Sequence, residues 1–228
     1  MSNEMIWLLF ALLNFSMIVL CYKLFGKTGL FAWIAMGTVI ANIQVVKMVE
    51  LFGMTATLGN IMFGTLFLAT DLINEKYGLK TAKKAVYIGF FALISVVVIM
   101  QVALQFDAIA ESLIMQSALL LIFGLIPRIA LASIVAYFIS QLFDVYVFQK
   151  IKEMLPKQRL LFVRNIGSTA ISQLLDTAIF VPIAFIGVVP NAILIDILIT
   201  TYIIKLLVAL LDTPFIYLMV KIQPLSTE

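Results

Sequence analysis

Seven long apolar stretches constrain the fold of this chain more than any other feature of its sequence. Each has about the 20 residues that an α-helix needs to cross a hydrocarbon layer of about 30 Å, well above the 9–11 or so of a barrel strand. Hydrophobic residues make up 64% of the chain and charged residues 12%, against about 45–50% and about 25% in soluble domains. The sequence predicts an all-α polytopic membrane protein, a bundle of six to seven transmembrane helices at Met5–Leu24, Leu30–Phe52, Leu58–Glu75, Ala85–Gln105, Arg128–Gln149, Asn165–Ile186 and Ala192–Met219.

Short connections join these stretches, so we expect one integral membrane domain over residues 1–228. The first helix, residues 5–24, either belongs to the core or is a peripheral addition to six core helices. It has no basic leader and no small-residue cleavage site, so we expect it to be retained. Ser117–Ile126 is apolar but too short to cross, and we expect an interfacial or re-entrant segment there.

Basic residues predict the orientation. Under strict alternation of the seven helices, twelve of the fifteen Lys and Arg residues fall on one side of the membrane, and that side marks the cytoplasm. The N-terminus is then outside and the C-terminus in the cytoplasm. We expect a multi-pass protein of the cell (inner) membrane.

Histidine is absent and Cys21 is the one cysteine. This excludes a disulfide within the chain and a Cys/His metal cluster. We expect neither a metal nor a cofactor, and any proton relay would depend on carboxylates.

Polar residues gather on the second and third predicted helices. Asn42, Lys47 and Glu50 lie toward the outer end of the second, where Lys47 and Glu50 at i,i+3 would either pair structurally or contact a substrate. On the third, Asp71, Asn74 and Glu75 share one face near the cytoplasmic end, where the alternative is a solvated helix end. Ionisable groups at membrane depth are costly and usually functional.

A short motif recurs on the fifth and sixth predicted helices, as Ile139-Ser140-Gln141-Leu142-Phe143-Asp144 and Ile171-Ser172-Gln173-Leu174-Leu175-Asp176. Counting about 1.5 Å per residue places Asp144 about 24 Å from Arg128, at the cytoplasmic end, and Asp176 about 18 Å from Arg164, near the midplane. Lys205 lies at similar depth on the last helix, two turns before Asp212. A lysine there would be neutral or paired, so we predict that Lys205 and Asp176 are neighbours.

These residues stand in blocks that resemble the queuosine-precursor transporter family, also called the vitamin uptake transporter family. The resemblance runs over nearly the whole chain from about Asn42. It rests on blocks that are specific in combination and in this order: Asn42…Lys47…Phe52-Gly53, Thr70-Asp71-Leu72-Ile73-Asn74-Glu75-Lys76-Tyr77-Gly78, Pro127-Arg128-Ile129-Ala130-Leu131-Ala132-Ser133, Ser140-Gln141-Leu142-Phe143-Asp144, Arg164-Asn165, Ser168-Thr169, Ser172-Gln173-Leu174-Leu175-Asp176-Thr177, Phe180, Lys205 and Asp212-Thr213-Pro214.

The resemblance implies an importer of 7-deazaguanines, such as 7-cyano-7-deazaguanine, its aminomethyl relative or queuine, that are salvaged for queuosine in tRNA. It also implies a distant relation to the substrate-binding components of energy-coupling-factor transporters. The expected partners are the small-molecule base and the lipid bilayer, without nucleic acid and without an ATPase module, the chain acting alone or as a homo-oligomer.

A guanine-like edge offers an N–H and an amine to a carboxylate, and a carbonyl oxygen to a donor. For that carboxylate we favour Asp176 over Glu50, with donors or orienting groups among Gln173, Asn42, Lys47 and Lys205. A gate or charge network is expected from the remaining polar residues, Asp71, Asn74, Glu75, Arg128, Gln141, Asp144, Arg164 and Asp212.

Two other functions compete with this one. The chain could be a substrate-binding component that needs ATPase partners. It could instead be an intramembrane enzyme, which would require a nucleophile, base or metal set; an Asp144–Asp176 dyad is conceivable, but the depth estimates separate the two carboxylates.

Overall fold

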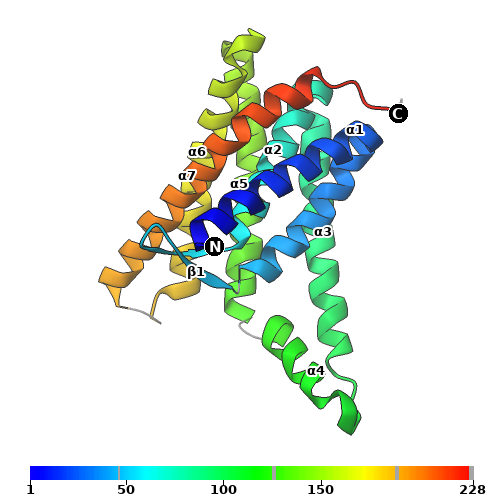
Figure 1. Cartoon of the computed structure of the whole chain (residues 1–228), viewed down its shortest axis with the longest axis vertical. Coiled ribbons are helices and arrows are strands. Elements are labelled where there is room, and N and C mark those ends of the chain that lie inside the picture. The colour runs from blue at the N-terminus through cyan, green and yellow to red at the C-terminus, as the bar shows by residue number, and fades with distance from the viewer. Residues whose placement is uncertain (46, 125–126, 188–189, 226–228) are drawn as a thin grey trace.

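The structure, a computed structural model, describes residues 1–228 except 46, 125–126, 188–189 and 226–228. The side chains at 48, 54–57, 124, 127–130, 192–193 and 196, among them that of Arg128, also lie outside the described part. The elements follow in the order α1 (Asn3–Gln44), β1 (Met48–Leu51), β2 (Met54–Thr57), α2 (Gly59–Tyr77), α3 (Leu79–Ala103), α4 (Leu113–Leu119), α5 (Pro127–Met154), α6 (Leu161–Phe185) and α7 (Asn191–Lys221) (Figure 1). The chain is an all-α polytopic membrane protein with one small hairpin.

Helix α1 crosses the membrane twice. Its 42 residues would span about 63 Å if straight, twice the hydrocarbon thickness. The chain reverses at Gly26, whose φ of 57° and ψ of −139° belong to a region that glycine alone occupies readily. The two halves approach closely there, since a Cβ on Gly29 would lie 2.7 Å from the carbonyl oxygen of Cys21.

The first half of α1 is packed on the bundle. Trp7, Phe15, Ile18 and Tyr22 are buried in the shared hydrophobic core, and the Phe15 ring stacks on that of Phe215 at 4.9 Å between centroids.

The prediction that the second helix continues to Phe52 is wrong. Helix α1 ends at Gln44, and residues 48–57 form an antiparallel hairpin in which Leu51 pairs with Met54. Phe52 (φ 53°) and Gly53 (φ 72°) both have positive φ, as in the two-residue type I′ turns that match the twist of paired strands. Lys47 and Glu50 are therefore not one helical turn apart, and no ion pair joins them in the described part of the chain.

Helix α2 occupies the centre of the bundle. Nearly every residue from Gly59 to Asn74 is buried, and α2 contacts α1, α3, α5, α6 and α7. Among the described residues, five other helices are long and apolar enough to span a membrane. Its neighbours shield α2 from lipid, and its polar residues Thr70, Asp71 and Asn74 are buried against them.

The remaining predicted helices are confirmed as α3, α5, α6 and α7, each with slightly shifted ends. The segment predicted to be interfacial, Ser117–Ile126, falls on the end of α4 and a π-helical turn at Leu120–Gly124, and its last two residues lie outside the described part. Helix α4 projects beyond the bundle (Figure 1), and its Leu113, Ile114 and Met115 are exposed.

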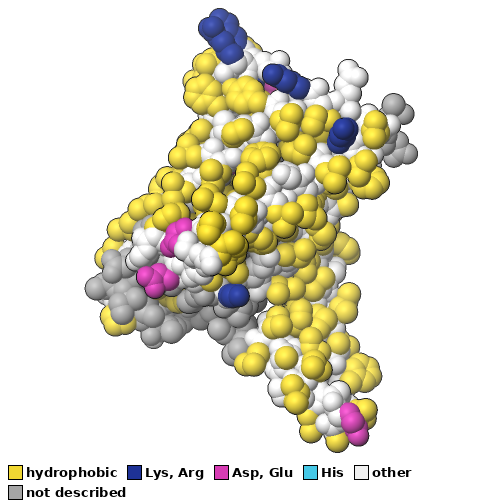
Figure 2. All heavy atoms as spheres, in the orientation of Figure 1, with side chains coloured by type: hydrophobic (Ala, Val, Ile, Leu, Met, Phe, Trp, Pro, Cys, Tyr) yellow, Lys and Arg dark blue, Asp and Glu magenta, His cyan; other side chains and the backbone are white. Residues whose placement is uncertain are grey.

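The connections that alternation predicts on one side do meet at one end. Lys76 Nζ donates to the Ile222 carbonyl (2.8 Å), and the Leu225 N–H donates to the Lys23 carbonyl (2.8 Å). Figure 2 shows that basic side chains gather at this end, where the C-terminus lies, whereas most of the visible acidic ones lie elsewhere. The positive-inside rule assigns this end to the cytoplasm.

Candidate functional site

Helices α5 and α6 form an antiparallel pair that carries the centre of the candidate site. Small buried residues, Ala132 and Ala136 on α5 and Ser168 and Ser172 on α6, line this pairing and permit close approach. The recurring motif lies on these two helices, so its two copies lie side by side and run in opposite directions.

The two copies contact each other across the helix pair. Ser140 Oγ on α5 donates to Asp176 Oδ1 on α6 at 3.0 Å. The equivalent serine of the other copy, Ser172 on α6, lies near the Asp144 carboxyl on α5 but donates to the Ser168 carbonyl at 2.8 Å. Asp144 and Asp176 therefore lie about one helical turn apart in depth, about 6 Å.

The predicted depth of Asp144 is consequently wrong. Helix α5 continues to Met154, which leaves about 15 Å of helix beyond Asp144, and its carboxyl is fully buried. The estimate took Gln149 as the end of the span.

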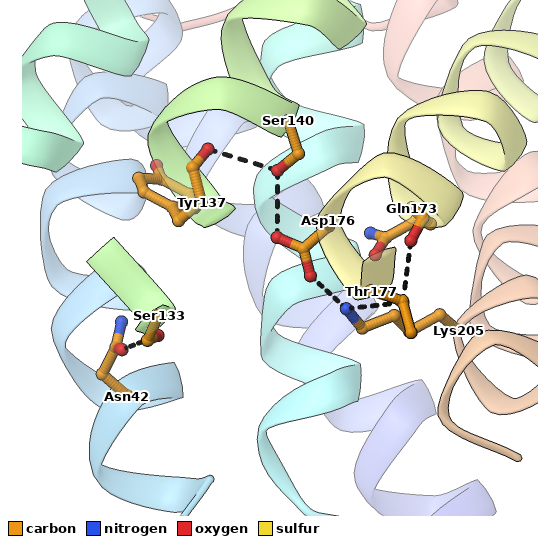
Figure 3. Close-up of polar contacts among 8 residues, drawn as sticks. All are labelled: Asn42, Ser133, Tyr137, Ser140, Gln173, Asp176, Thr177 and Lys205. Carbon is orange, nitrogen blue, oxygen red and sulfur yellow. Dashed lines mark hydrogen bonds and ion pairs between the residues drawn. The ribbon is translucent and has the colours of Figure 1, made fainter. Parts of the chain in front are cut away.

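The predicted contact between Asp176 and Lys205 is confirmed. Lys205 Nζ forms an ion pair with Asp176 Oδ2, and its Nζ also lies 3.5 Å from Thr177 Oγ1 (Figure 3). The side chains are only 17% and 7% exposed. Asp176 thus has a hydroxyl donor on one oxygen and an ammonium on the other.

Gln173 lies one turn before Thr177 on the same face of α6. Thr177 Oγ1 donates to the Gln173 backbone carbonyl at 2.8 Å. The Gln173 side chain is buried, yet its Oε1 has no hydrogen-bond partner within the described residues. A buried amide oxygen of this kind is available to a donor on a ligand.

Asn42 is held beside the same stretch of α5. Ser133 Oγ donates to Asn42 Oδ1, and the Asn42 amide donates to the Thr38 carbonyl at 2.9 Å. The Thr38 hydroxyl in turn lies 3.1 Å from the Tyr137 hydroxyl. In Figure 3, Asn42 and Ser133 lie apart from the Asp176–Lys205 pair, with Tyr137 between them and Ser140.

The structure does not bring Lys47 and Glu50 to this cluster. Both are exposed on the hairpin region, where Lys47 lines a pocket with Trp7 and Phe10. The Glu50 carbonyl accepts from Asn3 Nδ2 at 3.2 Å. They lie beside the first turns of α1.

The residues expected to form a charge network do meet, toward the cytoplasmic ends of α2, α5 and α6. Glu75 pairs with Arg164 at 3.0 Å and with Lys152 at 3.4 Å. Lys152 Nζ also donates to the Asn74 and Glu75 carbonyls, and Asn74 Nδ2 donates to the Val145 carbonyl at 2.8 Å. The network joins the ends of three helices.

Deeper in the bundle, Asp71, Asp144 and Asp212 approach one another, all with no exposed area. Asn165 Nδ2 donates to Asp212 Oδ1 at 2.6 Å, and Gln141 Oε1 accepts from Thr70 at 3.3 Å. Arg128, expected in the same network, has a side chain outside the described part.

Sequence reasoning did not select Ser140, Thr177, Lys152 and Asn165 as site residues, and it assigned Ser168 and Ser172 to helix packing alone. The available signal was spacing, because Ser168, Ser172 and Asp176 recur every four residues and so share one face of α6. The cluster around Asp176 can hold a small polar solute by hydrogen bonds from fixed donors and acceptors.

Comparison with known proteins agrees with a transport role. Residues 57–219 match a family described as "Putative vitamin uptake transporter". A Bacillus subtilis (strain 168) protein named "Probable queuosine precursor transporter" is 51% identical over 224 residues, 98% of this chain and 97% of that protein. A Haemophilus influenzae protein of the same name is 31% identical over 135 residues, 59% of this chain and 54% of that protein. No solved structure gives a significant match.

Proposed function

Because this chain belongs to the family described as "Putative vitamin uptake transporter", we propose that it imports queuosine precursors, that is 7-deazaguanine bases, across the cell membrane into the cytoplasm. The observation that carries the proposal is the Asp176 carboxylate, held in the bundle by Ser140 and Lys205. The names of the two relatives support the class of substrate.

The proposed cargo suits this carboxylate chemically. The edge of a 7-deazaguanine presents a ring N–H and an exocyclic amine side by side, and one carboxylate accepts from both. Asp176 is less buried than its neighbours on the same face, Gln173 and Thr177. It is thus the acceptor of the cluster that a solute reaches most easily.

The base carbonyl needs a donor, which we assign to Lys205. Its ammonium group already lies between Asp176 and Thr177, so it can contact both the carboxylate and the carbonyl beside it. A neutral base brings no charge, and the Asp176–Lys205 pair therefore stays electrically balanced with cargo bound. Gln173 Oε1, which lacks a partner, accepts a further N–H.

An aromatic ring is available for stacking. Phe180 lies four residues after Asp176, on the same face of α6, and is partly exposed. Flat bases stack on aromatic side chains with a gain of about 1–3 kcal/mol per base.

The test is rescue of queuosine in tRNA in a strain that neither makes the precursor nor has its own importer, supplied with each of the three bases. Wild-type rescue and loss of rescue with Asp176→Asn are expected. Asp107→Asn makes the same chemical change at an exposed position and serves as the matched control. Lack of rescue by all three bases would overturn the assignment.

We further propose that the chain works without an ATPase module, alone or as a homo-oligomer. Purified protein in liposomes should then take up base without nucleotide or partner chains. Uptake that required an added ATPase module would instead identify a substrate-binding component.

A further inference from the structure

Three carboxyl groups meet in the interior of the bundle, and Asn165, which donates to Asp212 Oδ1, is the one hydrogen-bond donor to them among the described residues. Asp71 on α2, Asp144 on α5 and Asp212 on α7 are each fully buried. Within the described residues, neither oxygen of Asp71 or Asp144 has a hydrogen-bond partner, nor has Oδ2 of Asp212. Buried carboxylate oxygens without donors are strongly unfavourable, so these oxygens indicate a missing positive ligand.

Neighbouring cations supply only part of that charge. Lys205 on α7 is paired with Asp176, whereas Arg164 on α6 and Lys152 on α5 share the single carboxylate of Glu75. That group therefore carries one excess positive charge, and Arg164 Nε and Nη2 have no hydrogen-bond partner within the described residues. One positive charge cannot balance three carboxylates, so at least two of them would be uncompensated if all were ionised.

The other helices packed around α2 add no cation to the cluster. The buried residues of α1 and α3 that the structure describes include no charged group. Tyr22 of α1 has its hydroxyl engaged by Lys76 and Tyr77 at the cytoplasmic end, and Tyr137 of α5 has its hydroxyl beside Thr38.

The contacts within the cluster favour a proton as the missing ligand. The Asp71 and Asp144 carboxyls are close enough to share a hydrogen bond once one of them is protonated, and the Ser168 hydroxyl lies beside both. Two carboxyl groups in contact do not both lose their protons; instead they hold one proton between them. No three acidic side chains of the described residues are arranged to hold a metal ion.

We propose that Asp71, Asp144 and Asp212 form a proton-binding site that couples solute import to proton entry. The inference rests on the proposed function insofar as coupling requires a transported solute. The proton site itself depends only on the three carboxyl groups.

One face of α6 connects this site to the proposed substrate site. Ser168 and Ser172 lie beside the proton site, although their hydroxyls donate to backbone carbonyls of α6, and Asp176 follows at the same spacing, about 12 Å from Ser168 along the helix. Ser140 on α5 completes the link, since it lies one turn from Asp144 and donates to Asp176. The helix that carries Asp144 thus also carries the hydroxyl that positions Asp176, and we propose that this shared helix couples the two sites.

The first experiment uses purified full-length protein in liposomes, with uptake of a labelled 7-deazaguanine measured at equal pH and with the exterior more acidic. At one proton per base, a gradient of about one pH unit should sustain about tenfold accumulation. Asp71→Asn and Asp144→Asn should abolish accumulation while exchange of internal for external base continues. Asp107→Asn should behave like the wild type.

Exchange by the wild type without any response to the pH gradient would overturn the coupling and leave the proposed function standing, as would accumulation driven by a sodium gradient instead. If no base is exchanged at all, the proposed function fails and infrared spectroscopy decides the proton site. The wild type at neutral pH should show the carbonyl stretch of a protonated carboxyl group, and Asp71→Asn or Asp144→Asn should remove it. A wild-type spectrum without that band overturns the proton site.

Discussion

Neutralising one partner of the Asp176–Lys205 pair should destabilise the protein strongly. The side chains of Asp176 and Lys205 are 17% and 7% exposed, so water hydrates the charge that remains only to a small extent. Removing one partner of a buried pair costs about 3–5 kcal/mol, because the other charge is left unpaired. Asp176 keeps its hydrogen bond from Ser140 in Lys205→Met, and Lys205 keeps its contact with Thr177 in Asp176→Asn. We therefore expect about 3 kcal/mol, the lower end of this range, for each variant.

The double variant Asp176→Asn/Lys205→Met should recover most of this loss. It contains no unpaired charge, and uncharged replacements of a buried pair are often neutral in stability. We expect its free energy of unfolding to lie within about 1 kcal/mol of the wild-type value. If the two substitutions acted independently, their losses would instead add to within about 0.3–0.5 kcal/mol. In soluble chains of this length, about 3 kcal/mol corresponds to roughly 6–12 °C in Tm, which thermal unfolding in detergent resolves.

The double variant should recover its stability but not its uptake activity. If Asp176 accepts the edge of the base, the folded double variant will not import it. Losses that simply add in the double variant would refute the pairing as an energetic unit. Normal import by the double variant would refute Asp176 as the acceptor.

Three further substitutions test other parts of the structure. Glu75→Gln should destabilise the protein by about 3 kcal/mol, because it leaves Arg164 buried at 1% exposure without its counter-ion. The control Glu153→Gln, in an exposed pair, should change the free energy of unfolding by less than about 1 kcal/mol, and equal effects of the two variants would contradict the reasoning. Gly26→Ala should lower Tm and folded yield, since the conformation at that position (φ 57°, ψ −139°) costs other residues about 1–3 kcal/mol; an unchanged Tm would argue against the reversal there. Gln173→Ala removes an amide oxygen that has no partner among the described residues, so we expect a higher KM for base uptake with little change in Tm, and an unchanged KM would exclude Gln173 from the contact.

The helices could be predicted from sequence because a lipid environment demands about 20 apolar residues per crossing. The hairpin could not, because its first strand continues the apolar run of the preceding helix without a break in composition. Its signals were local: β-branched Val45, Val46 and Val49, and the dipeptide Phe52-Gly53. β-Branched residues favour strands, and glycine permits the turn, but neither outweighs length and hydropathy when a long apolar run is divided into spans.

The contact between Asp176 and Lys205 could be predicted from sequence, because depth in the membrane was enough to identify the two partners. Counting residues along α6 and α7 places Asp176 and Lys205 at similar levels, and an unpaired charge there would be costly. Ser140 could not be selected in this way, because a serine matters only through the residue that faces it across a helix interface. That pairing depends on the register of α5 against α6, which neither segment specifies by itself.

The recurring motif explains why two similar aspartates have different chemistry. Ser140 donates to Asp176, whereas the equivalent Ser172 lies near Asp144 but donates to the Ser168 carbonyl. The third helix at each site differs: α7 presents Lys205 to Asp176, whereas α2 presents Asp71 to Asp144. The Asp176 carboxylate faces an ammonium group and can accept from a neutral base, while in the proposed proton site Asp144 faces a second carboxyl group with which it can share a proton. One helix pair thus provides both proposed sites, and the two helices packed against it determine which aspartate holds which ligand.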